Sequence, residues 1–259
     1  MSFLTLDNIS HHYFAKKSFT KALDNVSCKI NEGEITALLG QSGCGKSTLL
    51  SIISGIIQPT EGNILLDLKP LKQTDYTIGY MLEKDYLFSW KSIMDNVLVG
   101  PKISGQLSDY TRQKAVDLLR DVGVPDVGNY YPDSLSAEMR QRVALVRTLI
   151  MDPKILLLDE PFSATDYREK RKLEDVFSKM LKSCHKTTLL ATNDMEEAIC
   201  MSDRIIVMAP NPGTAARTFN VPIELREERP FLVRRHPKYQ LLFDKIWEVF
   251  ESFDKAVWP

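Results

Sequence analysis

Alternating apolar and polar residues predict several strands in the first part of the chain. β-Branched and polar residues alternate over residues 3–39, with turn signals at residues 24–25 (Asp-Asn) and 31–33 (Asn-Glu-Gly). The last segment, residues 35–39, is apolar throughout and leads into a glycine-rich turn. A continuous apolar run of this kind is typical of a buried parallel strand.

The next apolar stretch predicts a buried helix followed by another strand. Residues 46–57 are apolar enough for a helix inside the protein, and Pro59 and Gly62 are expected to close it. Residues 63–66 then resume a strand pattern.

Helical periodicity dominates from about residue 85 to residue 151. In the clearest helix, Ser108 is the expected N-cap and Gly123 the glycine that follows the C-terminus. Its apolar face has residues at i, i+3, i+4 and i+7: Ala115, Leu118, Leu119 and Val122. We therefore expect a helical subdomain at about residues 85–150.

Strand patterns return in the second half of the chain. They occur at residues 155–158, 187–192 and 204–208, with a helix of about residues 168–181 between the first two. Strands that alternate with helices indicate parallel crossovers, so the predicted fold class is α/β with an antiparallel β part at the N-terminus.

The tail after Pro210 is rich in proline and charge and ends in one amphipathic helix. Its apolar stripe comprises Tyr239, Leu242, Phe243, Ile246, Trp247, Phe250 and Phe253. Such stripes usually face the core of their own domain, although a helix that binds a partner would look the same. We predict one domain over residues 1–210 and a C-terminal extension over residues 211–259 that packs on it.

Composition argues against nucleic acid as a partner. Lys plus Arg number 33 and Asp plus Glu number 34, so no broad basic field exists to hold a phosphate backbone. The cysteines form neither a CxxC pair nor a disulfide framework, which favours reduced thiols in a cytoplasmic protein: Cys28, Cys44, Cys184 and Cys200.

No segment predicts a membrane span or a signal peptide. The longest apolar stretches, such as residues 49–57 and 155–158, fall well short of the roughly 18 residues that a bilayer-spanning helix needs. The first ten residues lack a basic region followed by an apolar core. Any connection to a membrane must therefore come from a partner.

A phosphate-binding loop is predicted between the strand at residues 35–39 and the helix that begins at residue 46. The segment matches GxxxxGK[ST] and consists of Gly40, Gln41, Ser42, Gly43, Cys44, Gly45, Lys46, Ser47 and Thr48. Its glycines let backbone N–H groups surround phosphate oxygens, and the helix N-terminus adds positive partial charge. Lys46 is expected to neutralise the β- and γ-phosphates of ATP, and Ser47 to ligate Mg²⁺.

Two acidic residues end the apolar strand pattern at residues 155–158. Asp159 is expected to hold the magnesium ion through water, and Glu160 to polarise the attacking water as general base. The alternative is a strand end that simply meets solvent.

Residues 135–142 (Leu-Ser-Ala-Glu-Met-Arg-Gln-Arg) identify a family resemblance. They are similar to the signature LSGGQRQR of the ATP-binding subunits of ABC transporters, which the chain resembles over nearly its whole length. The resemblance implies that Ser136 caps a helix whose N-terminus points at the γ-phosphate held by a second subunit, so the catalytic unit would be a dimer. The alternative is an exposed helix start with charges in its first two turns.

Other positions take their roles from the resemblance alone. Tyr13 lies where the family has the aromatic residue that stacks on adenine. Residues 163–166 (Ser-Ala-Thr-Asp) correspond to the D-loop, which implies that Asp166 contacts the phosphate-binding loop of the other subunit.

Three segments narrow the resemblance to importers of nitrate, sulfonate and taurine. They are residues 87–90 (Leu-Phe-Ser-Trp), Met139 within the signature, and residues 208–213 (Met-Ala-Pro-Asn-Pro-Gly). The resemblance implies transmembrane permease subunits as partners and a separate solute-binding protein that selects the solute. The chain itself would lie at the cytoplasmic face of the cell membrane as a peripheral subunit.

Three chemically important positions depart from the family pattern. Glu83 replaces the glutamine whose amide oxygen reaches magnesium, and it can still ligate the ion as a carboxylate. Asn193 replaces the histidine that contacts the γ-phosphate, and it can donate a hydrogen bond but cannot carry positive charge. Ala137 and Glu138 replace the signature glycines.

These departures predict weak ATPase activity for the chain alone. They affect the residues that close the dimer more than those that bind ATP, which favours a heterodimer with a related consensus ATPase over a slow homodimer. A second hypothesis is a chiefly structural or regulatory ATP-binding subunit. A third, a soluble ABC protein of DNA repair or translation, requires coiled-coil inserts or a second cassette, and the sequence has neither.

Overall fold

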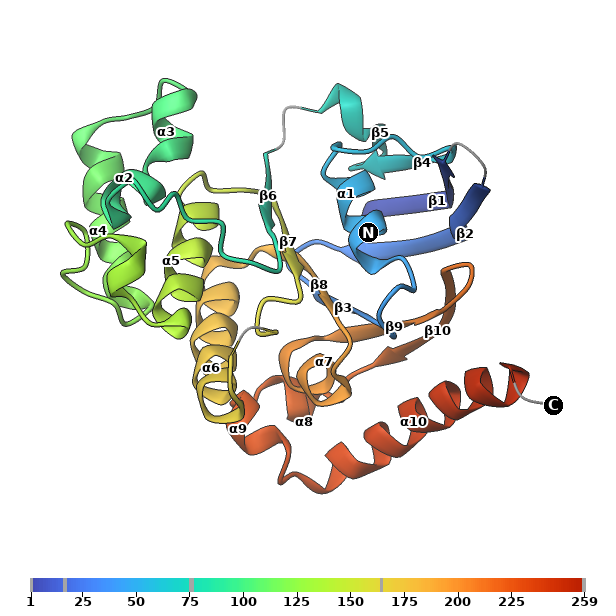
Figure 1. The fold of residues 1–259 in the computed structure, drawn as a ribbon. Coiled ribbons are helices and arrows are strands. Elements are labelled where there is room, and N and C mark those ends of the chain that lie inside the picture. Colours follow the sequence, from blue (N-terminus) through green and yellow to red (C-terminus); the bar gives the residue numbers. More distant parts are fainter. Residues whose placement is uncertain (1, 16–17, 75–76, 164, 258–259) are drawn as a thin grey trace. The chain divides into compact units, whose positions relative to one another are not determined.

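The computed structural model describes residues 2–15, 18–74, 77–163 and 165–257, which form two units (Figure 1). The first unit takes residues 1–75 together with 186–259, and the second takes residues 76–185. Both units combine strands and helices, which confirms the predicted α/β class.

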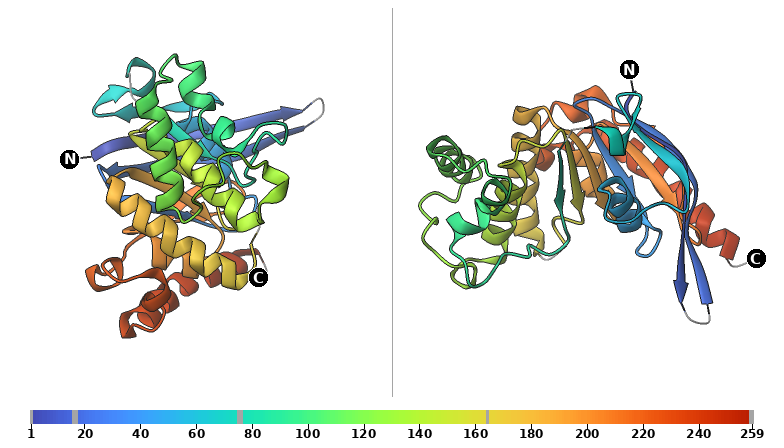
Figure 2. Two further views of the ribbon diagram at one scale, coloured as in Figure 1. Left: turned by 90° about the vertical axis from the view of Figure 1, so that its left-hand side faces the viewer. Right: turned by 90° about the horizontal axis from the view of Figure 1, so that it is seen from above.

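The first unit contains an antiparallel sheet with the strand order β2-β1-β4-β5. Its strands are β1 (Ser2–Ala15), β2 (Ser18–Asn31), β4 (Glu61–Leu66) and β5 (Lys69–Pro70). β4 confirms the predicted strand at residues 63–66, and it is followed by the short 3-10 helix η1 (Leu71–Gln73). The hairpin of β1 and β2 extends beyond its pairing with β4, as Figure 2 shows.

The predicted turn at residues 24–25 is wrong, because β2 runs through it. Asn25 adopts a left-handed conformation (φ 48°) inside the strand, and its backbone N–H donates to Ser10 Oγ at 3.0 Å. The Ser10 side chain on β1 thus accepts the hydrogen bond of a backbone N–H group that the irregular conformation of Asn25 removes from the strand pairing.

A second set of strands in the first unit lies in the order β10-β9-β3-β8. These strands are β3 (Ile35–Leu39), β8 (Thr187–Thr192), β9 (Arg204–Ala209) and β10 (Thr214–Asn220). β3 is buried along its whole length and pairs in parallel with both β8 and β9, as its continuous apolar sequence predicts.

The helix after β3 is shorter than predicted. α1 (Lys46–Ile53) ends before residue 57, because Ser54 closes it and Gly55 adopts a positive φ of 80°. The left-handed glycine stops the helix before Pro59 and Gly62 are reached.

The second unit is mainly helical and carries one parallel strand pair, β6 (Ile78–Met81) with β7 (Ile155–Asp159). Its helices are α2 (Ile93–Val97), α3 (Val99–Ile103), α4 (Asp109–Asp121), the 3-10 helix η2 (Pro132–Ser134), α5 (Ala137–Leu149) and α6 (Tyr167–Cys184). The caps predicted for α4 are confirmed: the Ser108 side chain accepts from Thr111 N in a capping box, and Gly123 has a φ of 77°.

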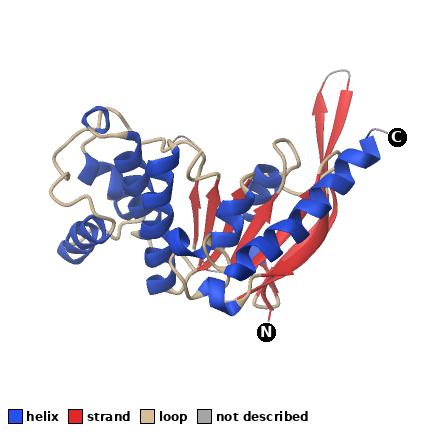
Figure 3. Ribbon diagram, turned by 90° about the horizontal axis from the view of Figure 1, so that it is seen from below, coloured by secondary structure: helices blue, strands red, loops and turns tan. Residues whose placement is uncertain are grey.

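The C-terminal helices belong to the first unit. They are α7 (Met195–Met201), α8 (Ile223–Arg226), α9 (Pro230–Val233) and α10 (Pro237–Val257). Figure 3 shows α10 as the long helix along the strands of this unit. β9 and β10 pair on either side of residue 210, where the sequence places a domain boundary, and that boundary stays a prediction.

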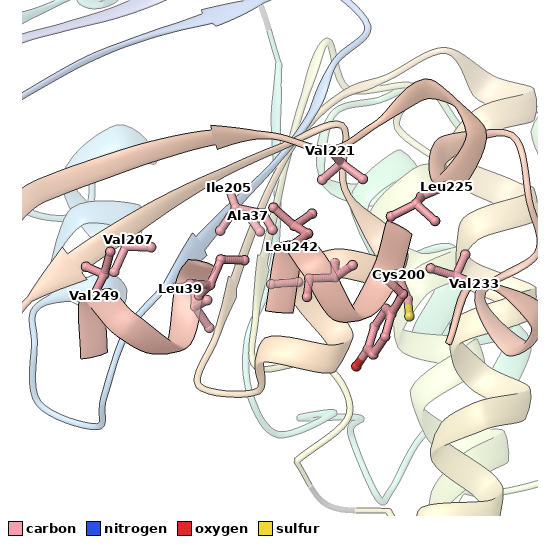
Figure 4. Packing of buried hydrophobic residues seen from close by; sticks show 14 residues of the cluster. Ala37, Leu39, Cys200, Ile205, Val207, Val221, Leu225, Val233, Leu242 and Val249 are labelled. Carbon is pink, nitrogen blue, oxygen red and sulfur yellow. The ribbon is translucent and has the colours of Figure 1, made fainter. Parts of the chain in front are cut away.

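Helix α10 contributes four buried side chains to a core beneath β3 and β9: Tyr239, Leu242, Ile246 and Val249. Figure 4 shows Leu242 and Val249 beside Leu39, Ile205 and Val207. Trp247, a member of the apolar stripe, does not face this core: it is 49% exposed, and its indole N–H donates to Glu251. No helix among the residues that the structure describes is long and apolar enough to cross a bilayer.

We predict that Ile246→Ala destabilises the protein by about 2–4 kcal/mol, because it leaves a cavity at a fully buried position. Leu241→Ala on the same helix is the matched control, since Leu241 is exposed and should change the free energy of unfolding by less than about 0.5 kcal/mol. Urea denaturation of both variants measures this difference. Equal effects would show that α10 is not anchored through its buried face.

Candidate nucleotide-binding site

Residues 40–45 form a curled loop between β3 and α1, and residues 46–48 are the first residues of the helix. Gly43 and Gly45 have φ values of 82° and 93°, which side chains rarely permit. The Lys46 ammonium group lies inside the curl, where Nζ donates to Gly40 O at 2.8 Å and Gln41 O at 3.2 Å. Because Lys46 is only 4% exposed, its charge is held at the position where phosphate oxygens are expected.

The loop is packed closely at both of its ends. A Cβ atom on Gly40 would lie 2.5 Å from Cys44 Sγ, and one on Gly45 would lie 2.6 Å from Leu23 Cδ2. Strand β2 therefore supports the loop from the side of the antiparallel sheet.

Gly213, in the turn between β9 and β10, also supports the loop. A Cβ atom there would lie 2.2 Å from the backbone oxygen of Cys44. Hydrogen bonds fix this turn to β2, from Gly213 N to Ala22 O at 3.0 Å and from Asp24 N to Gly213 O at 2.9 Å. Residues 208–213 carry the resemblance to the importers, and their closing glycine is the signal in the sequence for this contact.

The loop offers oxygen ligands for a metal that is bound together with phosphate. Ser47 is exposed at the first turn of α1, and Thr48 beside it is half-buried. Within the described residues, no group of three or more His, Cys, Asp or Glu could hold a metal ion. The Ser47 hydroxyl oxygen fits Mg²⁺, which usually takes few protein ligands and completes its shell with water and substrate phosphates.

Tyr13 lies on β1 next to the loop. Its hydroxyl group is 3.3 Å from Thr48 Oγ1, and its ring is 44% exposed. The structure thus places an accessible aromatic ring beside the predicted phosphate site, while its stacking on adenine stays a prediction.

Asn193 follows β8 in the first unit and is exposed. The residue before it, Thr192, accepts a hydrogen bond from Gly40 N at 3.2 Å, so this strand end is joined to the start of the loop. The γ-phosphate contact expected of Asn193 stays a prediction.

In the second unit, Asp159 ends β7 as a buried carboxylate. It is 5% exposed, and Oδ2 accepts a hydrogen bond from the Tyr80 hydroxyl at 3.1 Å. Because Asp159 is buried, it is not a strand end that meets solvent. Glu160 follows in a left-handed conformation (φ 44°) and is half-buried. A non-glycine residue in that conformation is uncommon and occurs preferentially at functional sites.

Ser136 caps α5, as predicted, since Oγ accepts from Met139 N at 3.2 Å. Glu138 forms an ion pair with Arg142, one turn further along the helix, and both side chains are mostly buried. Arg142 also donates to Val122 O at 2.9 Å, at the end of α4. The acidic signature residue therefore has a cationic partner within its own subunit.

The segment around Glu83 is attached to the same helix. Glu83 is exposed, and its backbone oxygen accepts from Gln141 Nε2 at 3.3 Å. Asp85 accepts from Arg140 Nε at 2.9 Å, and Arg147 donates to the backbone oxygen of Tyr86 at 2.8 Å. Sequence reasoning missed these connections, although Arg140 and Gln141 lie within the signature segment.

Asp166 is the N-cap of α6, where Oδ1 accepts from Arg168 N and Glu169 N, both at 2.9 Å. Ala164 of the D-loop lies outside the described residues. The predicted contact of Asp166 with another subunit stays a prediction.

The structure thus brings one group of the predicted site residues together in the first unit: residues 40–48, Tyr13 and the strand end before Asn193. The second unit carries the other group: Glu83, Ser136, Asp159, Glu160 and Asp166.

Comparison with known proteins decides which family this arrangement represents. The family model described as ABC transporter matches residues 23–163. The chain belongs to the ABC transporter family of ATP-binding proteins. The predicted phosphate loop at residues 40–48 and the predicted signature at residues 135–142 both lie within the matched range.

Relatives align with almost the whole chain. The ABC transporter ATP-binding protein YtlC of Bacillus subtilis is 46% identical over 98% of both chains. The taurine import ATP-binding protein TauB of Roseobacter denitrificans is 34% identical over 97% of both chains. The nitrate import ATP-binding protein NrtD of Synechococcus elongatus is 33% identical over 93% of this chain and 88% of its own.

A solved structure confirms the fold of the cassette. The ATP-binding cassette MJ0796, in a dimeric post-hydrolysis state bound to ADP and Pi, is 28% identical with a TM-score of 0.74. The match covers 85% of this chain and 99% of that one.

We predict that Lys46→Ala weakens ATP binding at least about tenfold, or 1.4 kcal/mol, because it removes the buried charge beside the phosphates. Titration calorimetry with ATP and magnesium measures the change. Lys69→Ala, at an exposed position on β5, is the matched control and should leave affinity unchanged. Unchanged affinity in Lys46→Ala would remove the assignment of the loop.

Proposed function

We propose that this chain drives the uptake of a small solute by coupling ATP binding and hydrolysis to a membrane permease. The observation that carries the proposal is the closed phosphate loop around Lys46 in a chain whose relatives include the taurine and nitrate import proteins. A small anion is the class of solute that those names suggest.

Within one subunit, the proposed roles follow from the chemistry of each side chain. Lys46 neutralises the β- and γ-phosphates, and Tyr13 stacks on the base. Ser47, Asp159 and Glu83 would hold Mg²⁺, which supplies charge neutralisation at the phosphates. Glu160 accepts a proton from the attacking water.

The dimer supplies the remaining groups. Ser136 and the N-terminus of α5 face the γ-phosphate held by the second subunit, where the helix dipole favours negative charge. Asp166 contacts the opposing loop. MJ0796 was solved as a dimer with ADP and Pi, which supports this arrangement.

The structure reduces the expected effect of the negative charge at Glu138, one of the departures from the family pattern. An unpaired Glu138 carboxylate about 5 Å from a phosphate charge would cost roughly 3 kcal/mol at an effective dielectric of about 20. Its ion pair with Arg142 offsets most of that repulsion. The remaining defect is steric, because Ala137 and Glu138 carry Cβ atoms where glycine allows close approach to phosphate.

We favour a heterodimer in which a related consensus ATPase supplies an intact signature to the loop of this chain. A homodimer would carry the departures at Ala137, Glu138 and Asn193 in both of its ATP sites. We therefore expect a homodimer to hydrolyse ATP slowly. A chiefly structural or regulatory subunit is the alternative, and Glu160 with Lys46 argues against it because base and phosphate charge are both retained.

The permease partner is proposed to bind the segment after Glu83. Trp90 is 73% exposed there and lies against Phe88, with ring centroids 5.3 Å apart. Large exposed aromatic residues of this kind are enriched in protein interfaces. The chain would thereby be held at the cytoplasmic face of the membrane, and a separate solute-binding protein would select the solute.

We predict that the double change Ala137→Gly and Glu138→Gly, with Asn193→His added, raises ATP turnover at least about tenfold, equivalent to 1.4 kcal/mol at the barrier. Steady-state phosphate release measures turnover, and Glu160→Gln reports the background. Glu138→Gln separates charge from shape: it should raise turnover little, because Arg142 already neutralises Glu138. If the unmodified chain is as fast as the restored one, the departures are tolerated and the weak-subunit proposal fails.

The importer proposal is tested by purifying the tagged chain together with the proteins that bind it. Mass spectrometry of the purified complex should identify multi-span permease subunits and a second ATP-binding subunit. Trp90→Ala should reduce their recovery, whereas Tyr110→Ala, at another exposed aromatic position, should not. A complex without multi-span proteins would contradict the proposed function.

A further inference from the structure

The ring of Tyr13 is held at two points in the first unit. At one end, its hydroxyl group lies 3.3 Å from Thr48 Oγ1 of the phosphate loop. On another side, the imidazole ring of His11 lies perpendicular to it, with centroids 4.7 Å apart and an interplanar angle of 82°. His11 and Tyr13 are two residues apart on β1, and their rings meet although the strand register shifts between His11 and His12.

His11 is an unusual residue for this position. It is 8% exposed, and its Nδ1 atom makes no hydrogen bond to any residue that the structure describes. Buried polar atoms normally have a partner, so hydrogen bonding of Nδ1 does not explain a histidine here. Its perpendicular contact with Tyr13 is a favourable geometry for aromatic rings.

The surroundings of His11 connect it with the loop. β1 pairs His11 with Leu23, and Leu23 occupies the space that a side chain on Gly45 would need. His11 therefore lies on the pair of strands, β1 and β2, that packs against the phosphate loop. Its imidazole ring contacts the ring of Tyr13 from this position.

We propose that His11 is a positioning residue for the nucleotide base, acting through Tyr13. The inference rests on the proposed stacking of the base on Tyr13. A side chain already held in place loses less freedom when the base binds, so its contact contributes more to affinity. Stacking uses the π-face that every base has, so His11 favours nucleoside triphosphates as a class and contributes nothing to the phosphates alone.

The test compares ATP, GTP and inorganic tripolyphosphate by titration calorimetry with magnesium. His11→Leu introduces an apolar side chain of similar size and removes the aromatic ring. It should weaken ATP and GTP roughly two- to tenfold and leave tripolyphosphate unchanged. His11→Phe keeps the ring contact and should retain wild-type affinity.

His12→Leu is the matched control. His12 is the next residue on β1, and its ring contacts Phe14 and Phe19. The same substitution there should leave all three affinities unchanged. In a Tyr13→Ala background, His11→Leu should have no further effect, because the residue through which it acts is gone.

The outcomes separate this inference from the proposed function. If Tyr13→Ala leaves ATP affinity unchanged, base stacking on Tyr13 fails and the inference with it. If Tyr13→Ala weakens ATP but His11→Leu does not, only the role of His11 is overturned. Equal weakening of tripolyphosphate by His11→Leu would make His11 a structural support of the loop and would also overturn the inference.

Discussion

The close packing of the phosphate loop is the constraint on which the site depends. Gly40, Gly45 and Gly213 each lie where a side chain would collide with the loop or its supports. Three separate segments, β3, β2 and the turn after β9, must therefore meet around residues 40–48 before Lys46 can be held inside. The loop conformation is thus set by the packing of three segments of the chain that lie far apart in the sequence.

The second unit shows how a departure from a family pattern can be compensated locally. Glu138 places a negative charge at a helix start that is expected to meet phosphate, but Arg142 neutralises it from the next turn. The same helix holds the segment after Glu83 through Arg140 and Arg147. The segment that we propose as the permease contact is thus joined by hydrogen bonds to the helix that Ser136 caps.

Sequence reasoning succeeded where structure depends on neighbouring residues and failed where it depends on distant ones. The cap by Ser136 and the phosphate loop follow from short segments and were predicted. The turn at residues 24–25 was wrong because the distant Ser10 satisfies the backbone of β2 there. The contacts of Gly213 and His11 arise only when the strands assemble, so no local pattern contains them.

In the proposed dimer, the phosphate loop of this chain and the signature segment of a second subunit enclose ATP together. Light-scattering mass of a Glu160→Gln variant that also carries Ala137→Gly and Glu138→Gly tests it most directly, because slow hydrolysis preserves the closed state. We expect a monomer without nucleotide, a dimer with ATP and magnesium, and a monomer again when Lys46→Ala is added. A monomer at ATP concentrations that saturate binding would contradict it.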